Sequence, residues 1–206
     1  MAKTTPTSTG PAQDQVEQKI QKLRELYADA PEVGKAALEQ GLSDIKKELA
    51  APAGSQSAGR IGARQGRVSE LTVIVPFASG GAKRLRGLLQ LLGGNFRGAE
   101  LLGTVHDMRF VFLDNDTKLL FATAYDDDWD PYIDDFATKI PDALDVLFCN
   151  TEGWPGIRSP KVKDWIVAHQ ISAESWYVAN PNLTVTDTRR LEHVGKAVEK
   201  FLDEMA

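Results

Sequence analysis

The segment Gly103–Phe136, with the sequence GTVHDMRFVFLDNDTKLLFATAYDDDWDPYIDDF, carries the strongest fold signal in the chain. Residues 104–113 and 118–125 are rich in β-branched and aromatic residues, and the turn formers Asp-Asn-Asp separate them at 114–116. This pattern predicts two antiparallel strands joined by a tight turn. A helix is predicted over residues 131–140, because an aspartate precedes it as N-cap and a proline suits its first position.

Elements on either side of this segment complete a small α+β domain, residues 69–206. Before it, the sequence predicts a strand and then a helix, and a pair of glycines ends this helix. Two short strands, a short helix and a long C-terminal helix are predicted after it. The C-terminal helix has an apolar stripe from Leu191 to Met205 and opens on Thr184 and Asp187, which suit a capping box. The flanking strands are predicted over residues 71–77, 143–149 and 175–179, and the flanking helices over 83–92 and 162–169.

The order strand-helix-strand-strand-helix-strand is that of a ferredoxin-like antiparallel sheet with helices on one face. Along residues 104–113, simple alternation places His106 on the same side as Met108 and Phe110, and Arg109 on the other side. Neither side is wholly polar, so we expect both faces of the sheet to be covered. We predict a homodimer that closes sheet against sheet and leaves an enclosed chamber near His106.

The N-terminal part of the chain is organised differently. Residues 1–13 are rich in Thr, Pro and Ala and are expected to form a disordered tail. Residues 14–49 show two helical stripes separated by a proline, which predicts a helical hairpin. Residues 50–68 have the composition of a flexible Gly/Ala/Ser linker, whose three arginines could contact an acidic partner.

The composition argues against several classes of function. The chain has 206 residues, a formal net charge of -5 and no apolar run long enough to span a membrane. The negative charge argues against nucleic-acid binding, and the N-terminus has no apolar secretory segment. The single cysteine, Cys149, excludes an internal disulfide and fits a reducing compartment. We therefore predict a cytoplasmic protein that binds neither membranes nor nucleic acids.

Three titratable residues in the first strand of the hairpin form the candidate catalytic group: His106, Asp107 and Arg109. Histidine titrates near neutral pH and serves as a general base or as a haem ligand. Asp107 and Arg109 lie two residues apart on one strand face, so they can pair with each other or bind a carboxylate. The alternative is structural: His106 finds a hydrogen-bond partner within the sheet, and Asp107 and Arg109 form an ordinary ion pair on the surface.

Aromatic residues near the strand ends form the predicted substrate-binding group. His169, at the end of a short helix, is a second candidate haem ligand, although a histidine there also suits the helix dipole. The acidic run at 126–130 lacks the spacing of a calcium loop and indicates helix capping, so no metal site is predicted. The Ser-Gly-Gly turn at 79–81 is a candidate phosphate site that lacks the Walker and dinucleotide patterns. The aromatic group consists of Tyr125, Trp129, Trp176 and Tyr177.

The segments GTVHDMRFVFLD, LLFATAYDDDWDPYIDDF and SWYVANPNLTV, with this element order, resemble a family of little-characterised bacterial proteins. Over residues 69–206 the chain is similar to the dimeric α+β-barrel superfamily, which includes dye-decolorising peroxidases, chlorite dismutases and small cofactor-free monooxygenases. The Gly-x-x-Asp-Gly signature of the peroxidases is missing, so their distal acid has no counterpart here. The resemblance implies a peroxidase- or oxygenase-like oxidoreductase, with haem as a candidate cofactor.

Three functions are therefore compatible with the sequence. The first is a redox enzyme that acts on a small hydrophobic molecule in the chamber near His106 and Arg109. The second is haem binding through His106 or His169. The third is a non-catalytic assembly or scaffold protein whose helical hairpin at 14–49 binds a partner. Similarity of fold alone does not choose among them.

Overall fold

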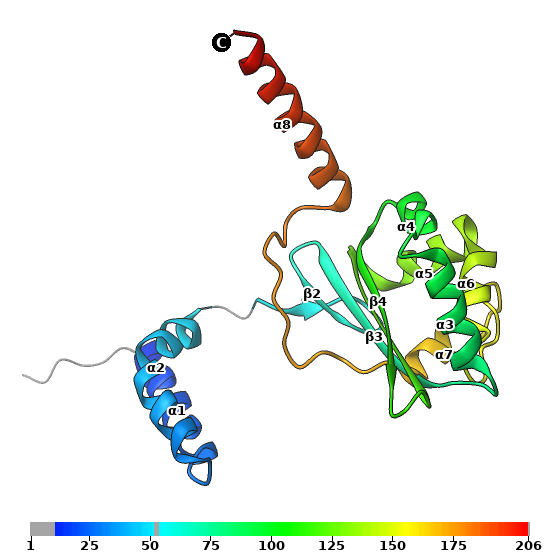
Figure 1. Cartoon of the computed structure of the whole chain (residues 1–206). Coiled ribbons are helices and arrows are strands. Elements are labelled where there is room, and N and C mark those ends of the chain that lie inside the picture. Colours follow the sequence, from blue (N-terminus) through cyan, green and yellow to red (C-terminus); the bar gives the residue numbers. More distant parts are fainter. Residues whose placement is uncertain (1–10, 52–53, 206) are drawn as a thin grey trace, which may run out of the picture. The chain divides into compact units, whose positions relative to one another are not determined.

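The computed structural model describes residues 11–51 and 54–205, and the chain divides into two compact units between residues 53 and 54 (Figure 1). Residues 1–10 of the expected disordered tail lie outside the described residues. Residues 11–13, which were also expected in the tail, belong to the first helix. No helix in the two described ranges is both long enough and apolar enough to cross a membrane.

The first unit consists of two helices packed on each other, α1 (Pro11–Leu26) and α2 (Glu32–Ala50). Pro31 separates them, because proline suits the entry to a new helix but cannot continue the previous one. Arg24 of α1 forms a bidentate ion pair with Glu39 of α2, with N–O distances of 2.7 and 2.8 Å. The buried apolar side chains of this unit are Val16, Ile20 and Leu38.

The second unit is built on an antiparallel sheet of five strands in the described part of the chain, in the order β1-β2-β3-β5-β4. The β4–β5 hairpin confirms the sequence-based prediction. Its turn residues 114–116 all have positive φ angles (50, 53 and 64°), which aspartate and asparagine tolerate better than most residues. The strands are β1 (Gln56–Ser57), β2 (Ala63–Gln65), β3 (Val68–Pro76), β4 (Val105–Leu113) and β5 (Lys118–Asp126).

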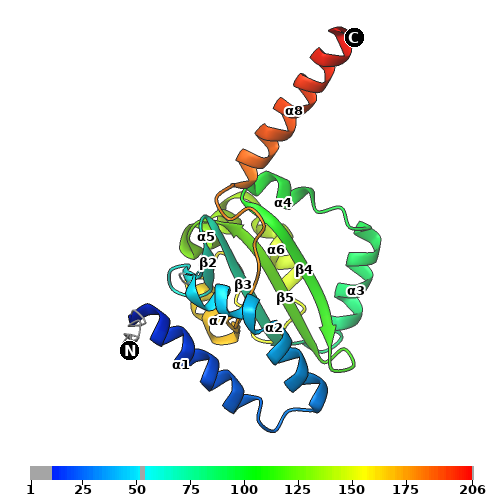
Figure 2. The ribbon, with the colours of Figure 1, turned by 90° about the vertical axis from the view of Figure 1, so that its left-hand side faces the viewer.

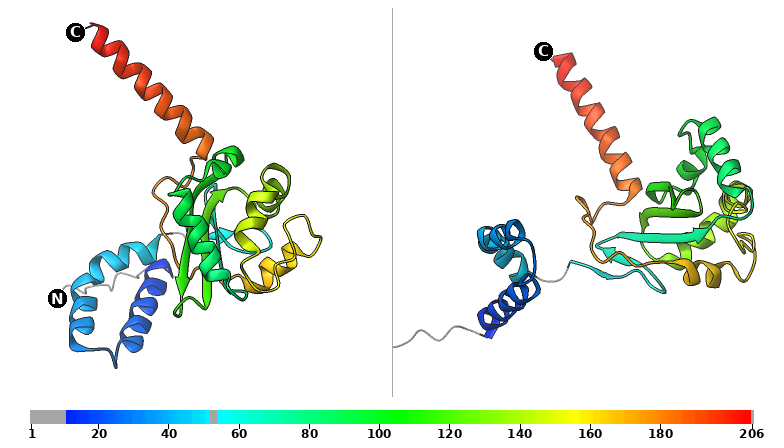
Figure 3. Two further views of the ribbon diagram at one scale, coloured as in Figure 1. Left: turned by 45° about the vertical axis from the view of Figure 1, so that its right-hand side comes forward. Right: turned by 60° about the horizontal axis from the view of Figure 1, so that its bottom comes forward.

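Helices cover one face of this sheet (Figures 1 and 3). Successive strand residues point to opposite faces, so Leu71, Val73 and Val75 of β3 are all buried beneath the helices. Aromatic rings join the layers, as Phe121 of β5 meets Phe148 edge to face with ring centroids 5.2 Å apart. The helices on this face are α3 (Gly81–Leu92), α4 (Arg97–Leu102), α5 (Trp129–Lys139), α6 (Pro141–Phe148) and α7 (Val162–His169).

An extended segment, residues 170–184, crosses the opposite face of the sheet, and we call it the strap (Figure 2). Hydrogen bonds tie it to the sheet along its length. The amide of Ile171 donates to the carbonyl of Thr72 (2.9 Å), and the side chain of Gln65 donates to the carbonyl of Trp176 (2.7 Å). The strap therefore covers part of the face on which we expected a second subunit.

The strap leads into the C-terminal helix α8 (Val185–Met205). The predicted capping box is confirmed: the amide of Asp187 donates to Thr184 Oγ1 (3.0 Å), and the amide of Thr184 donates to Asp187 Oδ2 (3.1 Å). The Thr184 hydroxyl also donates to Asp187 Oδ2 (2.6 Å), and this hydrogen bond, with that of the Thr184 amide, holds the pKa of the Asp187 carboxyl below its usual range. The start of α8 is thus fixed by the residue pair that the sequence indicated.

Residues 143–149 were predicted as a strand, and this prediction is wrong, because residues 141–148 form α6. Its buried residues Leu144, Leu147 and Phe148 follow helical spacing, and Val146 among them is exposed. A short apolar run satisfies both the helical and the strand period. The proline at the first helical position and the aspartate in the first turn favour the helix.

The closing strand predicted at 175–179 is not formed, because these residues belong to the strap. In a ferredoxin-like sheet the fourth strand would pair with the free edge of β3. Here β2 pairs only with Val68 and Ser69 at the start of that edge, and Gln170 at the start of the strap forms an isolated antiparallel bridge with Val73 further along it. The fold is therefore a mixed α+β fold with an antiparallel sheet, and its strand set differs from the expected one.

The stretch that we predicted as a flexible linker, residues 50–68, contains β1 and β2 and begins β3. Its arginines find their acidic partners within the same chain rather than on another molecule. These exposed ion pairs add little stability individually but tie the stretch to the domain. The pairs are Arg60–Asp164 (2.5 Å), Arg64–Asp128 (2.6 Å) and Arg67–Asp127 (2.6 Å).

Candidate functional site

A β-bulge in β4 determines where the candidate catalytic residues lie. Val105 pairs with Tyr125 and Asp107 pairs with Ala124, so His106 is an extra residue between two paired positions. The bulge interrupts the alternation along the strand. Val105 and Met108 pack against the core under the helices, whereas His106 and Asp107 both line a hollow on the strap face. His106 therefore does not share a face with Met108, contrary to the alternation that we assumed.

The His106 ring is held by a buried carboxylate. Nε2 of His106 lies 2.8 Å from Oδ1 of Asp126, whose side chain is only 5% exposed, against 24% for His106. Asp126 also accepts hydrogen bonds from the Val185 amide at the start of α8 (3.1 and 3.3 Å). With Asp126 ionised, Nε2 carries the ring proton, and Nδ1 is the acceptor atom of the neutral ring. The pair therefore fixes both the orientation and the tautomer of the histidine.

The hollow beside His106 has a volume of about 450 Å³ and lies between the sheet and the strap. This volume is within the range of small-molecule sites. Its lining combines small apolar residues of β5, polar and charged residues of β3 and β4, and aromatic residues of the strap. The lining residues are Val68, Glu70, Thr72, His106, Asp107, Arg109, Ala122, Thr123, Ala124, Ala173, Trp176, Tyr177, Val178 and Ala179.

The charged groups of the hollow differ in exposure. Arg109 and Asp107 lie at its mouth, with side chains 65% and 51% exposed, and Nε of Arg109 is 3.5 Å from Oδ1 of Asp107. Glu70 is buried and accepts hydrogen bonds from the Ala63 amide and the Thr72 hydroxyl, both at 3.2 Å. Arg109 can therefore leave its weak pair with Asp107 and bind an anionic ligand, whereas Glu70 already accepts hydrogen bonds from the protein.

Two of the four predicted substrate-binding aromatics line the hollow, and both come from the strap. Tyr177 is 87% exposed, so a ligand could bury much of its ring. Trp176 Nε1 is buried and has no hydrogen-bond acceptor among the described residues. A ligand oxygen or a water would satisfy this donor.

The other two predicted aromatics lie in the core on the helix side of the sheet, away from the hollow. Tyr125 and Trp129 are fully buried there. Tyr125 stacks on Tyr132 of α5 with ring centroids 3.8 Å apart and planes inclined by 9°. Burial raises the pKa of both tyrosine hydroxyls far above the usual range, so neither ionises near neutral pH. These residues hold α5 on the sheet.

His169 does not join the site either. Its Nδ1 lies 2.8 Å from the carbonyl oxygen of Trp165, one turn earlier in α7, and its ring packs on that tryptophan with centroids 4.4 Å apart. It does not line the hollow that contains His106. The structure thus separates the two candidate haem ligands.

The acidic run at 126–130 forms ion pairs and hydrogen bonds, and Asp130, the aspartate expected as N-cap, lies in the first turn of α5, which begins at Trp129. Asp128 occupies the N-cap position of α5 but makes no capping hydrogen bond through its side chain. Asp127 and Asp128 pair with two arginines of the β2–β3 region, and Asp130 pairs with Lys163 at 2.9 Å. Within residues 11–51 and 54–205, no three His, Cys, Asp or Glu side chains are grouped so as to hold a metal ion.

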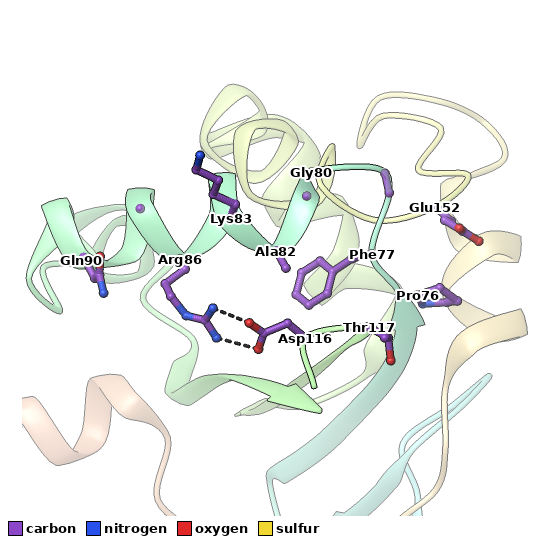
Figure 4. A pocket seen from close by; sticks show the side chains of 13 residues that line it. Pro76, Phe77, Gly80, Ala82, Lys83, Arg86, Gln90, Asp116, Thr117 and Glu152 are labelled. Carbon is purple, nitrogen blue, oxygen red and sulfur yellow. Dashed lines mark hydrogen bonds and ion pairs between the residues drawn. The ribbon is translucent and has the colours of Figure 1, made fainter. Parts of the chain in front are cut away.

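The Ser-Gly-Gly turn at 79–81 borders a second, larger hollow of about 900 Å³ beside α3 (Figure 4). Protein groups already engage its nearby arginines. Arg86 forms a bidentate pair with Asp116 (2.5 and 2.7 Å), and Arg84 donates to the side chain of Asn150 and to the carbonyl of Ser79. Arg84 and Arg86 are therefore engaged by the protein, whereas Lys83, which also lines this hollow, forms no ion pair among the described residues.

Sequence reasoning missed Glu70 and the role of Asp126. Glu70 is the one charged residue in the strand run VSELTVIVP, and a charge in such a run is a usable signal for a site. Asp126 was visible only as part of an acidic run. Its contact with His106 depends on the bulge, which strand alternation does not predict. Comparison of the chain with protein-family models, with curated proteins and with solved structures finds no match, so the resemblance to dimeric α+β barrels stays a prediction.

Proposed function

We propose that the protein binds a small, largely apolar molecule with an anionic group in the hollow between sheet and strap, and that His106 acts on it as a general base. Removal of a proton from the ligand by the positioned imidazole would give an electron-rich anion and an imidazolium, and molecular oxygen as second substrate would be the oxidant of an oxygenase-like reaction. An oxidoreductase is the class that the resemblance to dimeric α+β barrels implies. In this proposal the hollow, rather than a chamber closed by a second subunit, is the binding site.

The observation that carries the proposal is the contact between His106 and the buried carboxylate of Asp126 (2.8 Å). A histidine whose one nitrogen is held by a carboxylate presents its other nitrogen in a defined direction. No hydrogen bond of Nδ1 is found among the described residues. The β-bulge that turns His106 into a ligand-sized hollow adds support, because β-bulges are over-represented next to active sites.

The lining of the hollow indicates the chemistry of the ligand. Ala122 and Ala124 give a flat apolar floor, because their side chains are too short to fill the space above β5. Tyr177 offers an exposed ring that can stack on an aromatic ligand. Arg109 at the mouth offers a charge-assisted bond to a carboxylate or an enolate. A planar aromatic carboxylate combines these features.

Haem fits the hollow less well. Nε2 of His106 is engaged by Asp126, and His169 lies outside the hollow. A Soret band in the purified protein that disappears in His106→Ala would favour haem ligation over the base role.

The binding site is tested by titration with a fluorescent aromatic carboxylate, 3-hydroxy-2-naphthoate, and with its methyl ester. Arg109→Ala is expected to weaken binding of the acid about tenfold or more, because one charge-assisted bond is lost. Binding of the uncharged ester is expected to change little. The control is Arg97→Ala, since Arg97 borders a separate apolar hollow on the helix side of the sheet. Loss of binding in Arg97→Ala but not in Arg109→Ala would place the ligand in that other hollow and contradict the proposal.

The base role is tested by nitrogen-15 NMR of the histidine rings at about pH 8, above the ordinary imidazole range. We expect the His106 ring to carry its proton on Nε2, because Asp126 accepts from that atom. In Asp126→Asn the charge is removed, so a mixture of the two tautomers is expected. His193→Gln removes a histidine of α8 and serves to assign the spectrum. A native ring with its proton on Nδ1 would leave no base facing the ligand.

A further inference from the structure

Helix α8 carries an apolar stripe that no other part of the second unit covers, among residues 54–205. Six large apolar side chains lie along one side of it, each at least half exposed. A surface helix of a globular protein normally turns such a stripe toward the core. These residues are Leu191 (54%), Val194 (50%), Val198 (50%), Phe201 (58%), Leu202 (54%) and Met205 (64%).

The spacing of the stripe is that of a coiled-coil seam. Residues 191, 194, 198, 201 and 205 follow steps of three and four, which are the a and d positions of two heptads. With about 100° of rotation per residue, all six side chains fall within about 100° of arc. Such a seam is complementary to a second helix of the same kind rather than to a flat sheet.

We infer that α8 pairs with α8 of a second copy of this chain, in antiparallel orientation. The residues that border the seam on one side supply the reason. In order along the helix they are Arg190, Ala197 and Glu204: a cation, a small residue and an anion. When two such helices run in opposite directions, this border lies against the same border of the partner, with the order of its residues reversed. Each arginine then faces the partner's glutamate, and the two small residues meet in the middle.

The parallel arrangement lacks this complementarity. Parallel seams bring this border against the other border of the partner, which contains Gly195 and Leu202 and offers no charge to Arg190 or Glu204. Antiparallel helix dipoles also oppose each other favourably. Glu204 has only a loose contact with Lys200 of its own helix, 3.7 Å between exposed side chains, and can bind a partner's arginine as well.

The attachment of α8 to the domain also suits the antiparallel pair. The Val185 amide binds Asp126, so the domain sits at the N-terminal end of the helix. Two antiparallel helices of 21 residues, about 31 Å long, keep the two domains at opposite ends. A seam of two heptads is small, below about 1,200 Å² of total buried area, so we expect reversible association in the micromolar range.

The experiment is analytical ultracentrifugation of the full-length chain from about 1 to 200 μM, a range that brackets micromolar association. We expect a monomer–dimer equilibrium for the native chain. Val198→Asp places a charge at the centre of the seam and should leave a monomer across the range, at least a tenfold loss of association. Lys196→Asp is the matched control, because residue 196 lies on the opposite side of the same helix and its substitution should leave the dimer intact. Both sites are exposed, so both variants should keep the native fold by circular dichroism.

Orientation is tested by charge exchange. Arg190→Glu alone and Glu204→Arg alone place like charges opposite each other and should weaken the dimer. The double variant, and an equimolar mixture of the two single variants, should recover it, because each restores opposite charges across an antiparallel pair. Association that ignores these exchanges would overturn the antiparallel assignment. A native chain that stays monomeric over the whole concentration range would overturn the proposed dimer. Such a monomer, combined with a lower free energy of unfolding in Val198→Asp, would indicate that α1 and α2 cover the stripe.

Discussion

The variant Gly81→Ala is expected to be less stable than the native protein by about 3 kcal/mol, because there is no room for the added methyl group. A Cβ atom at residue 81 would lie 2.0 Å from the carbonyl oxygen of Asn150 and 3.0 Å from its carbonyl carbon. These are backbone atoms, so relief of the clash requires a shift of the whole segment. The expected loss exceeds that of an ordinary surface substitution several-fold.

Asn150 has little freedom to move away from residue 81. Its side-chain amide donates to the carbonyls of Val146 and Leu147 at 3.0 and 3.1 Å, and its backbone carbonyl accepts from Ala78 at 2.9 Å. The side-chain oxygen of Asn150 also accepts a hydrogen bond from Nε of Arg84 (3.0 Å). The end of α6 and the start of α3 are thus joined through this one buried residue. A shift of Asn150 would break several of these bonds at once.

The matched control is Gly87→Ala in the same helix. A Cβ atom there would have no neighbour within 4 Å, so the substitution should stabilise α3 by about 0.5–1 kcal/mol through its helix propensity. Denaturant unfolding of both variants measures the difference. Equal effects at the two positions would show that the close approach of residue 81 to Asn150 does not form in solution.

The elements that were predicted correctly are those whose signals are local. The β4–β5 hairpin follows from two alternating runs and a turn of three residues that tolerate positive φ. The start of α8 follows from a capping box that needs only Thr184 and Asp187. Neither prediction depends on contacts between distant parts of the chain, and this is why sequence alone was sufficient.

The candidate site was predictable only in part, because it is built from distant segments. His106, Arg109, Trp176 and Tyr177 were all predicted, and the structure brings them to one hollow. The orientation of His106 depends on a bulge, and a bulge depends on the register between β4 and β5. The strap could not be foreseen either, since residues 175–179 have the composition of a strand. They form no strand: the strap pairs with the edge of β3 only at its start, where Gln170 bridges Val73, and residues 175–179 then cross the face of the sheet.

The second large effect on the free energy of unfolding is expected in helix α6. A strand over the same residues would bury a different set of side chains, so substitutions there also distinguish helix from strand. Phe148→Ala should lower the free energy of unfolding by about 3–5 kcal/mol, the usual cost of removing a buried phenylalanine. The ring is 5% exposed and lies among other aromatic rings, with centroid distances of 5.2 Å to Phe121 and 5.1 Å to Trp154. The cavity left behind would lie between α6 and the sheet, at a point where neither layer can collapse without breaking other contacts.

Val146→Ala is the comparison that separates helix from strand. In a strand over 143–149, Val146 would share the buried face of Leu144 and Phe148, and its truncation would cost about 1–2 kcal/mol or more. In α6 it is 53% exposed, so the same change should stay within about 0.5 kcal/mol. Leu147→Ala reverses the expectation: it should cost about 2–5 kcal/mol in the helix, where Leu147 is buried, but little in a strand that turns it outward. Denaturant unfolding of the three variants therefore tests the helix through its pattern of buried positions. A costly Val146→Ala beside a harmless Leu147→Ala would restore the strand, and the contact of α6 with Asn150 would be lost with the helix.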